Sequence, residues 1–329
     1  LDFEGTVDLT AEQGKTGALL LDPTNLTITT ADNNVTGATP FTPSGAASTL
    51  SVSTLATALD SADVIVTTVG SPDTGIEAGD ITVASSIGWF SANKLTLQAA
   101  NDIVINTNIN IQSFDGSLAM GAGGDITQNS GGRLLIGGTT ELNAGGNISL
   151  TSTINQMIGA VDATAVGNIS LTNARTLELG NVSAGGDVTL TTSSNSGSIN
   201  VSGTFDATSL AATAHSTGAI SIADVNSGLT VTKLEAGGAI TLGNDDTGAL
   251  IFDASSGDVI TGNASAGGQA SGIVNVKGAS VTLNDSIRTK GGNIFLTAMS
   301  GDVTAGSGAH IVSTADDNTG TASGSVTVT

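Results

Sequence analysis

The sequence predicts an all-β fold, a right-handed parallel β-helix (β-solenoid) with coils of about 20 residues. A short glycine-led phrase recurs along most of the chain, and the residues between its copies alternate between apolar and polar. Such alternation is typical of strands buried on one side only. The third observation is composition: 45 of the 329 residues are glycine and only 2% are aromatic. A core must therefore be built from stacked Val, Ile, Leu and Ala.

The recurring phrase consists of Gly, a small or polar residue, and a β-branched–polar–apolar triplet. The first series has steps of 22, 21 and 19 residues and comprises Gly124-Asp125-Ile126, Gly146-Asn147-Ile148, Gly167-Asn168-Ile169 and Gly186-Asp187-Val188. The second, offset by 11 residues, comprises Gly197-Ser198-Ile199, Gly218-Ala219-Ile220, Gly238-Ala239-Ile240 and Gly257-Asp258-Val259, with later copies at Gly272-Ile273-Val274 and Gly292-Asn293-Ile294. Repetition with this period indicates one coil per repeat, and the helical leucine-rich consensus that shares the period is missing.

The glycines of these phrases are predicted to be structural corner residues. They are Gly124, Gly146, Gly167, Gly186, Gly197, Gly218, Gly238, Gly257 and Gly292. A coil turns sharply between its faces, and glycine adopts a positive φ at little steric cost. We expect the residue two positions after each glycine to point inward, so that Ile126, Ile148, Ile169 and Val188 form one column.

Residues 1–75 differ from residues 76–329, which we expect to form a continuous β-helix in the same overall domain. All four prolines lie in the first segment. Strand-like Ala18–Leu21 and Leu26–Thr29 precede a Pro- and Thr-rich stretch, Ala31–Ser48, which is expected to leave the helix as an insertion. A short helix is predicted from Ser53 to Ser61, capped by Ser53 or Thr54.

Charge and cysteine content exclude several classes of protein. The chain has eight Lys and Arg but 29 Asp and Glu, which gives a formal charge of −21. This charge repels nucleic acid and anionic lipid. Without cysteine there is no disulfide framework and no thiolate metal site. No stretch approaches the ~20 apolar residues of a membrane span, and Leu1-Asp2-Phe3-Glu4 is no signal peptide. We expect the chain to be a fragment or a processed piece.

The order of several segments resembles the secreted passengers of filamentous-haemagglutinin-like two-partner-secretion exoproteins of Gram-negative bacteria and cyanobacteria. The segments are Leu19–Ile28 with its Leu-Asp-Pro phrase, Leu50–Leu59, Val64–Thr68 and Leu95–Asn106, and the glycine repeats extend the likeness to the C-terminus. The resemblance implies export through an outer-membrane transporter and an adhesive role at the cell surface. The resemblance implies no catalytic residues in this chain.

Candidate chemistry is sparse. Asp245-Asp246 and Asp316-Asp317 lie in turn-like runs, where solvated turn residues are the simpler interpretation and a weak Ca²⁺ site the alternative. Trp89 is expected to be a bulky bend packed on the coil rather than a sugar platform. His215 and His310 lack metal-ligand spacing. No catalytic or cofactor-binding residues are predicted.

The sequence therefore favours a non-catalytic, structural and adhesive rod, secreted or at the cell surface. Its expected partners are a host or neighbouring cell surface, polysaccharide or copies of itself end to end, but not nucleic acid. Three alternatives remain: a flat Thr-rich face binding polysaccharide or ice, which the uneven spacing disfavours; a subunit of an extracellular filament or sheath; and a polysaccharide-active β-helix enzyme, which needs paired carboxylates in a groove.

Overall fold

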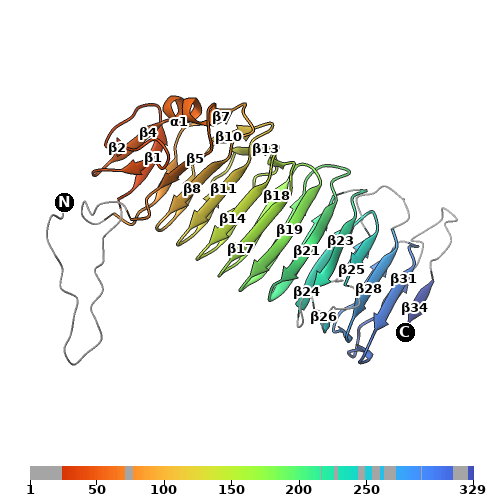
Figure 1. Ribbon diagram of the computed structural model, residues 1–329. Coiled ribbons are helices and arrows are strands. Elements are labelled where there is room, and N and C mark those ends of the chain that lie inside the picture. The colour runs from red at the N-terminus through yellow and green to blue at the C-terminus, as the bar shows by residue number, and fades with distance from the viewer. Residues whose placement is uncertain are drawn as a thin grey trace, which may run out of the picture.

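A computed structural model describes residues 24–70, 77–215, 217–225, 229–243, 249–253, 260–262, 272–289, 291–313 and 325–329. The chain is a β-solenoid of about 12 turns about 22 residues apart, with almost no helix. Its strands pair in parallel with the coils before and after them, apart from one small antiparallel pair, and the stack forms an elongated body (Figure 1). The fold class predicted by the repeats is confirmed.

Two long sheets run along the solenoid. Sheet A contains β1 (Leu26–Thr29), β4 (Ser48–Ser51), β6 (Ile81–Val83), β9 (Ile103–Ile105), β12 (Ile126–Gln128), β15 (Ile148–Leu150), β18 (Ile169–Asn173), β20 (Asp187–Thr192), β22 (Ser209–Ala214), β24 (Leu229–Ala236), β26 (Leu250–Phe252), β27 (Ile260–Gly262), β29 (Val281–Leu283), β30 (Ile287–Thr289), β32 (Val303–Ala305) and β33 (Ile311–Ser313). Sheet C contains β5 (Val64–Thr67), β8 (Leu95–Ala99), β11 (Leu118–Ala122), β14 (Thr140–Ala144), β17 (Val161–Ala165), β19 (Leu177–Ala184), β21 (Ile199–Asp206), β23 (Ile220–Val225), β25 (Ile240–Leu242), β28 (Val274–Gly278), β31 (Ile294–Ala298) and β34 (Val326–Val328).

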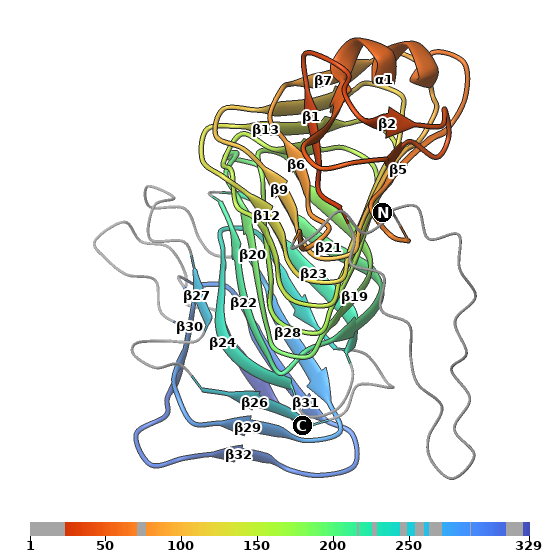
Figure 2. The ribbon, with the colours of Figure 1, turned by 90° about the vertical axis from the view of Figure 1, so that its left-hand side faces the viewer.

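A third face exists only in part of the stack. In the N-terminal coils it is sheet D, made of β7 (Ile87–Trp89), β10 (Asn110–Ser113), β13 (Arg133–Ile136) and β16 (Gln156–Met157). From β18 to β25 successive strands alternate between sheets A and C alone. Sheet A then forks at β24, whose first half pairs with β26 and whose second half pairs with β27 (Figure 2).

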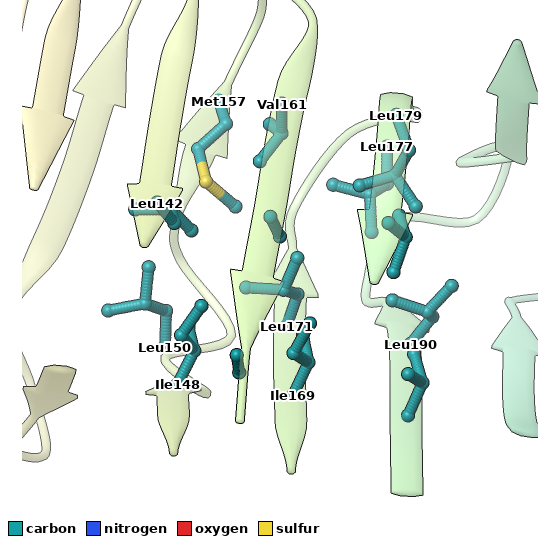
Figure 3. Packing of buried hydrophobic residues seen from close by; sticks show 14 of the residues in the cluster. Leu142, Ile148, Leu150, Met157, Val161, Ile169, Leu171, Leu177, Leu179 and Leu190 are labelled. Carbon is teal, nitrogen blue, oxygen red and sulfur yellow. The ribbon is translucent and has the colours of Figure 1, made fainter. Parts of the chain in front are cut away.

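The inward column expected from the glycine phrases is confirmed. Ile126 pairs with Ile148, Ile148 with Ile169, and Ile169 with Val188, and all four side chains are buried. Leu150, Leu171 and Leu190 point into the same interior (Figure 3). Alternation therefore places every second residue of a strand in one continuous aliphatic core.

The second glycine series belongs to the other long sheet. Ile199, Ile220 and Ile240 pair in succession in sheet C, so its 11-residue offset from the first series is half a coil. Gly257-Asp258-Val259 lies outside the described residues. The next strand in this column starts at Val274, which pairs with Ile240. The series therefore continues at Gly272-Ile273-Val274.

The stretch that was expected to leave the solenoid closes its N-terminal end. It forms an antiparallel pair, β2 (Val35–Thr36) with β3 (Thr42–Pro43). Phe41 lies beside β5 in sheet C: its N–H donates to the carbonyl of Ile65 at 2.8 Å, and its own carbonyl accepts from Thr67 N–H at 2.9 Å. Because Phe41 is also buried, part of this insertion is core rather than loop.

The helix α1 (Val52–Leu59) takes the place of a sheet D strand in the first described coil, between β4 of sheet A and β5 of sheet C. Leu55 and Leu59 are its buried residues. The helix was predicted, but its cap was placed wrongly. Ser51 is the cap residue, and its hydroxyl accepts from Thr54 N–H at 3.1 Å. The misplacement follows from Val52, which is half-buried at the start of the helix and so belongs to it.

Candidate functional site

An exterior ladder of Asp and Asn side chains explains the glycine phrases. Each Oδ1 accepts the backbone N–H of the residue at the same position in the next coil. The distances are 2.7 Å from Asp125 N to Asp102, 2.6 Å from Asn147 N to Asp125, 2.9 Å from Asn168 N to Asn147, and 2.7 Å from Asp187 N to Asn168. Hydrogen bonds to carboxylates are stronger than those between neutral groups. The ladder therefore clips neighbouring coils together at this corner.

The glycine before each of these residues is required for close approach and not for a positive φ. A Cβ on Gly124 would collide with Asp102 Oδ1, and one on Gly146 with Asp125 Oδ1. The same collision arises at Gly167 with the Asn147 oxygen and at Gly186 with the Asn168 oxygen. These glycines do not have positive φ. The conformational reason inferred from the sequence is therefore wrong for them.

The corner glycines of the second series are limited mainly by neighbouring backbone. A Cβ on Gly218 would collide with the carbonyl oxygen of Gly197, and one on Gly238 would lie 2.8 Å from that of Gly218. Gly197 is crowded by Ser194 Oγ at 2.7 Å. Gly292 is buried, and its carbonyl accepts the hydroxyls of Thr289 and Ser313, each at 2.7 Å.

Of the other residues singled out in the sequence, the structure describes Trp89, His215 and His310. Asp245, Asp246, Asp316 and Asp317 lie outside the described residues, as does Gly257. Trp89 is buried in β7, where its indole N–H donates to Asn93 O at 2.9 Å, so it is an inward strand residue rather than a bend. His215 and His310 are both exposed.

Metal-binding and membrane-spanning elements were also sought in the described ranges. No group of three or more His, Cys, Asp or Glu that could hold a metal ion occurs within them. The one described helix is too short to cross a membrane.

A furrow lies on the outer face of sheet C, centred on β11. Two small residues, Ala119 and Gly121, form its floor together with the backbone of Met120 and Leu142. Longer side chains border it on both sides: Thr96 and Gln98 on β8, and Glu141 and Asn143 on β14. The hollow measures about 450 Å³ and extends to Asp162 and Thr164 on β17.

A second hollow of about 270 Å³ continues the furrow toward the C-terminal end of β11. It shares Gln98, Gly121 and Asn143 with the first and adds Ala122 and Val69, which is 57% exposed. At the opposite end the Lys94 ammonium lies 3.2 Å from Glu141 Oε1. Since Lys94 precedes β8 and Glu141 lies on β14, this ion pair spans the intervening strand β11. The small Ala119 leaves room for the crossing.

Two phenylalanines are exposed in the turns that lead from sheet D into β8 and β11. Phe90 is 82% exposed and Phe114 is 62% exposed. They lie in neighbouring coils, because the residues before them, Trp89 and Ser113, are paired. Sequence reasoning missed both phenylalanines and the furrow. The signal available was Phe90 directly after the inward Trp89, since strand alternation places consecutive residues on opposite sides.

Comparison with known proteins gives one match. Residues 67–164 and 166–227 match a family described as Repeats of unknown function (DUF5649). No curated protein and no solved structure matches the chain. The matched residues cover the coils in which the Asp and Asn ladder, the furrow and the exposed phenylalanines lie. The family description assigns none of these features a function.

Proposed function

We propose that this chain is a non-catalytic, structural and adhesive segment of a large secreted bacterial surface protein, in which a stiff rod presents binding faces. The observation that carries the proposal is the continuity of the two long sheets. The twelve strands of sheet C pair in one uninterrupted order from β5 to β34. A stack of repeats joined by backbone ladders and a continuous aliphatic core fits a structural rod.

The character of the outer surface supports adhesion through many weak contacts. Charged residues make up only 11% of the chain, and the ion pairs on its surface include Lys94–Glu141 and Lys233–Glu235. Outward positions on sheet A include a row of mostly hydroxyl side chains, Thr82, Val104, Thr127, Ser149, Ser170 and Thr189. Such surfaces suit polysaccharide and the polar surfaces of host or neighbouring cells.

The export route and location of the proposed protein rest on its resemblance to filamentous-haemagglutinin-like exoproteins. On that basis we propose export through an outer-membrane transporter and residence outside a Gram-negative bacterium or cyanobacterium. Sequencing of the gene's neighbourhood tests this assignment, and an outer-membrane transporter gene beside it would support the proposal. Detection of the full-length product in the cytoplasm of intact cells, with none on the cell surface, would contradict it.

Two alternatives make different use of the same stack. A filament subunit joined end to end needs open coils at both ends, whereas an antiparallel bridge from Asn33 to Thr49 occupies part of the outer side of β4, the terminal described strand of sheet A. A polysaccharide-active enzyme could use Glu141 and Asp162, which are paired neighbours in sheet C. These carboxylates face an open furrow, and no Arg lines it. The rod with binding faces accounts for more of the structure.

Incubation of the purified chain with plant, algal and bacterial polysaccharides tests the proposal. We expect co-sedimentation with at least one polysaccharide, no new reducing ends and no unsaturated products. Substitution of any single surface Asp by Asn, apart from Asp162 in the furrow over β11, is expected to leave co-sedimentation nearly unchanged. Turnover that is lost on Glu141→Gln or Asp162→Asn would establish the enzyme alternative instead.

A further inference from the structure

We propose that the furrow over β11 is a binding site for a neutral glycan chain. The inference rests on the proposed function and assigns it a location and a ligand class. Its floor and its two borders come from three consecutive coils, and its polar groups are amides, hydroxyls and carboxylates. These groups match the hydroxyls of a sugar, which both donate and accept hydrogen bonds.

Gly121 is the first independent reason to regard the furrow as a site. A Cβ built on Gly121 has nothing within 4 Å, and the residue has no positive φ. It therefore differs from Gly124 and Gly146, where a Cβ would collide with the preceding coil. Glycine inside a strand is unfavourable and often marks a position where a ligand approaches closely. A glycine that the fold does not require here is explained by a ligand lying on the backbone of β11.

The dimensions of the furrow suit a single extended chain. Strands in a sheet lie about 4.8 Å apart, so the borders on β8 and β14 are separated by roughly 10 Å. A parallel strand rises about 3.3 Å per residue, so the five residues of β11 (Leu118–Ala122) extend roughly 16 Å. Between these borders the space is longer than it is wide, and on the β14 side it opens toward Asp162 and Thr164 of β17. A short run of sugar rings fits this space.

The chemistry of the furrow excludes the other common chain-like ligands. A peptide bound by strand addition needs a free sheet edge, whereas β8, β11 and β14 each have partners on both sides. Anionic glycans and nucleic acid are repelled by the formal charge of −21 and by Glu141 and Asp162, which line the furrow. Lys94, the one cation of the furrow, is paired with Glu141.

Phe90 and Phe114 add a second reason, although neither of them lines the furrow itself. They are exposed in the turns that enter β8 and β11, the border and the floor of the furrow, on the side where Lys94 lies. Exposed aromatic rings in neighbouring coils offer an apolar platform, and the apolar faces of sugar rings stack on such platforms. A glycan that extends beyond the N-terminal end of β11 would meet these rings in addition to the amides that border the furrow.

The test is a binding assay on the whole 329-residue chain, with immobilised neutral oligosaccharides (β-1,3- and β-1,4-glucans, chitin, xylan and mannan) and anionic polygalacturonate. The furrow variants are Ala119→Gln and Gly121→Gln, which fill the floor. Ala211→Gln is the matched control, because Ala211 is also an outward, half-buried strand residue but lies on sheet A. Gly121→Gln is expected to melt at the temperature of the unsubstituted chain or above it, since nothing lies within 4 Å of a Cβ at that position. Ala119→Gln also displaces the exposed ion pair between Lys94 and Glu141, which stabilises the fold little. It and Ala211→Gln are therefore expected to melt only slightly below the unsubstituted chain.

We expect one neutral glycan class to bind, each furrow variant to weaken binding at least tenfold, and Ala211→Gln to have no effect. Phe114→Ser is expected to weaken binding severalfold. Binding that the furrow variants leave unchanged would overturn the furrow site while leaving an adhesive rod with dispersed contacts intact. Absence of binding to every neutral glycan, or preference for polygalacturonate, would overturn the inference itself.

Discussion

The three-faced coils between β6 and β17 and the two-faced coils between β18 and β25 are built from the same repeat but close their cores differently. In the three-faced coils strands are two to five residues long, and sheet D contributes Trp89 and Met157 to the core. In the two-faced coils strands reach eight residues, as in β19 and β21. Register shifts accompany these long strands, at Leu179/Val182 and Val201/Thr204.

The number of faces in a coil does not depend on how many residues the coil contains. It depends on where along the coil the backbone bends. The step from Ile81 to Ile103 is 22 residues, and the step from Val188 to Leu210 is also 22. A long strand with a bulge replaces two short strands with a corner, because a bulge bends a strand and increases its twist. The two segments that match the repeat family, 67–164 and 166–227, meet where the three-faced coils end.

The end of sheet D is closed by one buried side chain. Asn173 Oδ1 accepts Met157 N–H at 2.9 Å, and its Nδ2 donates to the carbonyls of Met157 at 3.0 Å and Thr176 at 2.9 Å. The amide thus pairs with Met157 as a backbone peptide of a next strand would. At the other end of sheet D the helix α1 occupies the strand position. Sheet D therefore ends at helix α1 on one side and at the Asn173 side chain on the other.

The largest effect is expected from a charge in the shared core. Ile148→Asp in the three-faced region and Leu190→Asp in the two-faced region should each cost at least about 4 kcal/mol, since both side chains are buried and the new carboxylate has no partner. Urea unfolding followed by circular dichroism measures the loss. Ser149→Asp, on the outward side of the same strand as Ile148, is the control and should change stability little. A small cost at Leu190 alone would show that the two-faced core is looser.

A loss confined to the three-faced coils is expected from Asn173→Leu. This change leaves Met157 N–H and two carbonyls without partners, at a cost of about 3 kcal/mol. Hydrogen exchange should show faster exchange in β13 and β16 and unchanged protection in β21 and β23. Asn195→Leu, at an exposed asparagine, is the control. Equal loss of protection in both regions would mean that Asn173 supports the whole stack and not the end of sheet D.

The features that could be predicted from the sequence are those that depend on residues close together in the chain. The inward column through Ile126 and Val188 was predictable because each member follows its glycine at a fixed offset. The third face was not, because β7 and β16 have no shared phrase: one reads Ile87-Gly88-Trp89 and the other Gln156-Met157. Their pairing depends on coil geometry rather than on residues next to each other.

The furrow and the glycine requirement were hidden for a related reason. Ala119, Thr96 and Glu141 form one row only once the register between coils is known, and they are 22 or 23 residues apart in the chain. The collision at Gly146 involves Asp125, which lies a full coil earlier. The repeat in the sequence shows how many residues make up one coil. Which residues of neighbouring coils touch can be stated only when the pairing register of their strands is known.

An intermediate effect is expected at the corner glycines, and its origin should differ between the two glycine series. Gly146→Ala should cost about 1–3 kcal/mol because the new Cβ meets Asp125 Oδ1. In an Asp125→Ala background much of that cost should disappear, and urea unfolding of the four proteins measures the coupling. Gly218→Ala in the two-faced region meets the backbone oxygen of Gly197, so no side-chain change should rescue it. Additive costs of Gly146→Ala and Asp125→Ala would contradict the ladder explanation.

The smallest effect concerns pH at the helix that begins the third face. The backbone N–H of Ser51, at 2.6 Å, and then the Thr54 hydroxyl, also at 2.6 Å, lower the pKa of Asp32 below its ordinary value. Because the folded pKa is depressed, the stabilisation is complete above the unfolded pKa and is lost as pH falls through the folded one. It should amount to less than about 1 kcal/mol, since Asp32 is exposed and screened by solvent.

The difference in unfolding free energy between the chain and Asp32→Asn, followed from pH 5 to pH 2, isolates this carboxylate from the other acids. The difference should shrink toward the acid end, with faster hydrogen exchange in α1 but not in β21. A difference that grew on acidification would mean that the carboxylate opposes the Ser51 cap rather than supporting it.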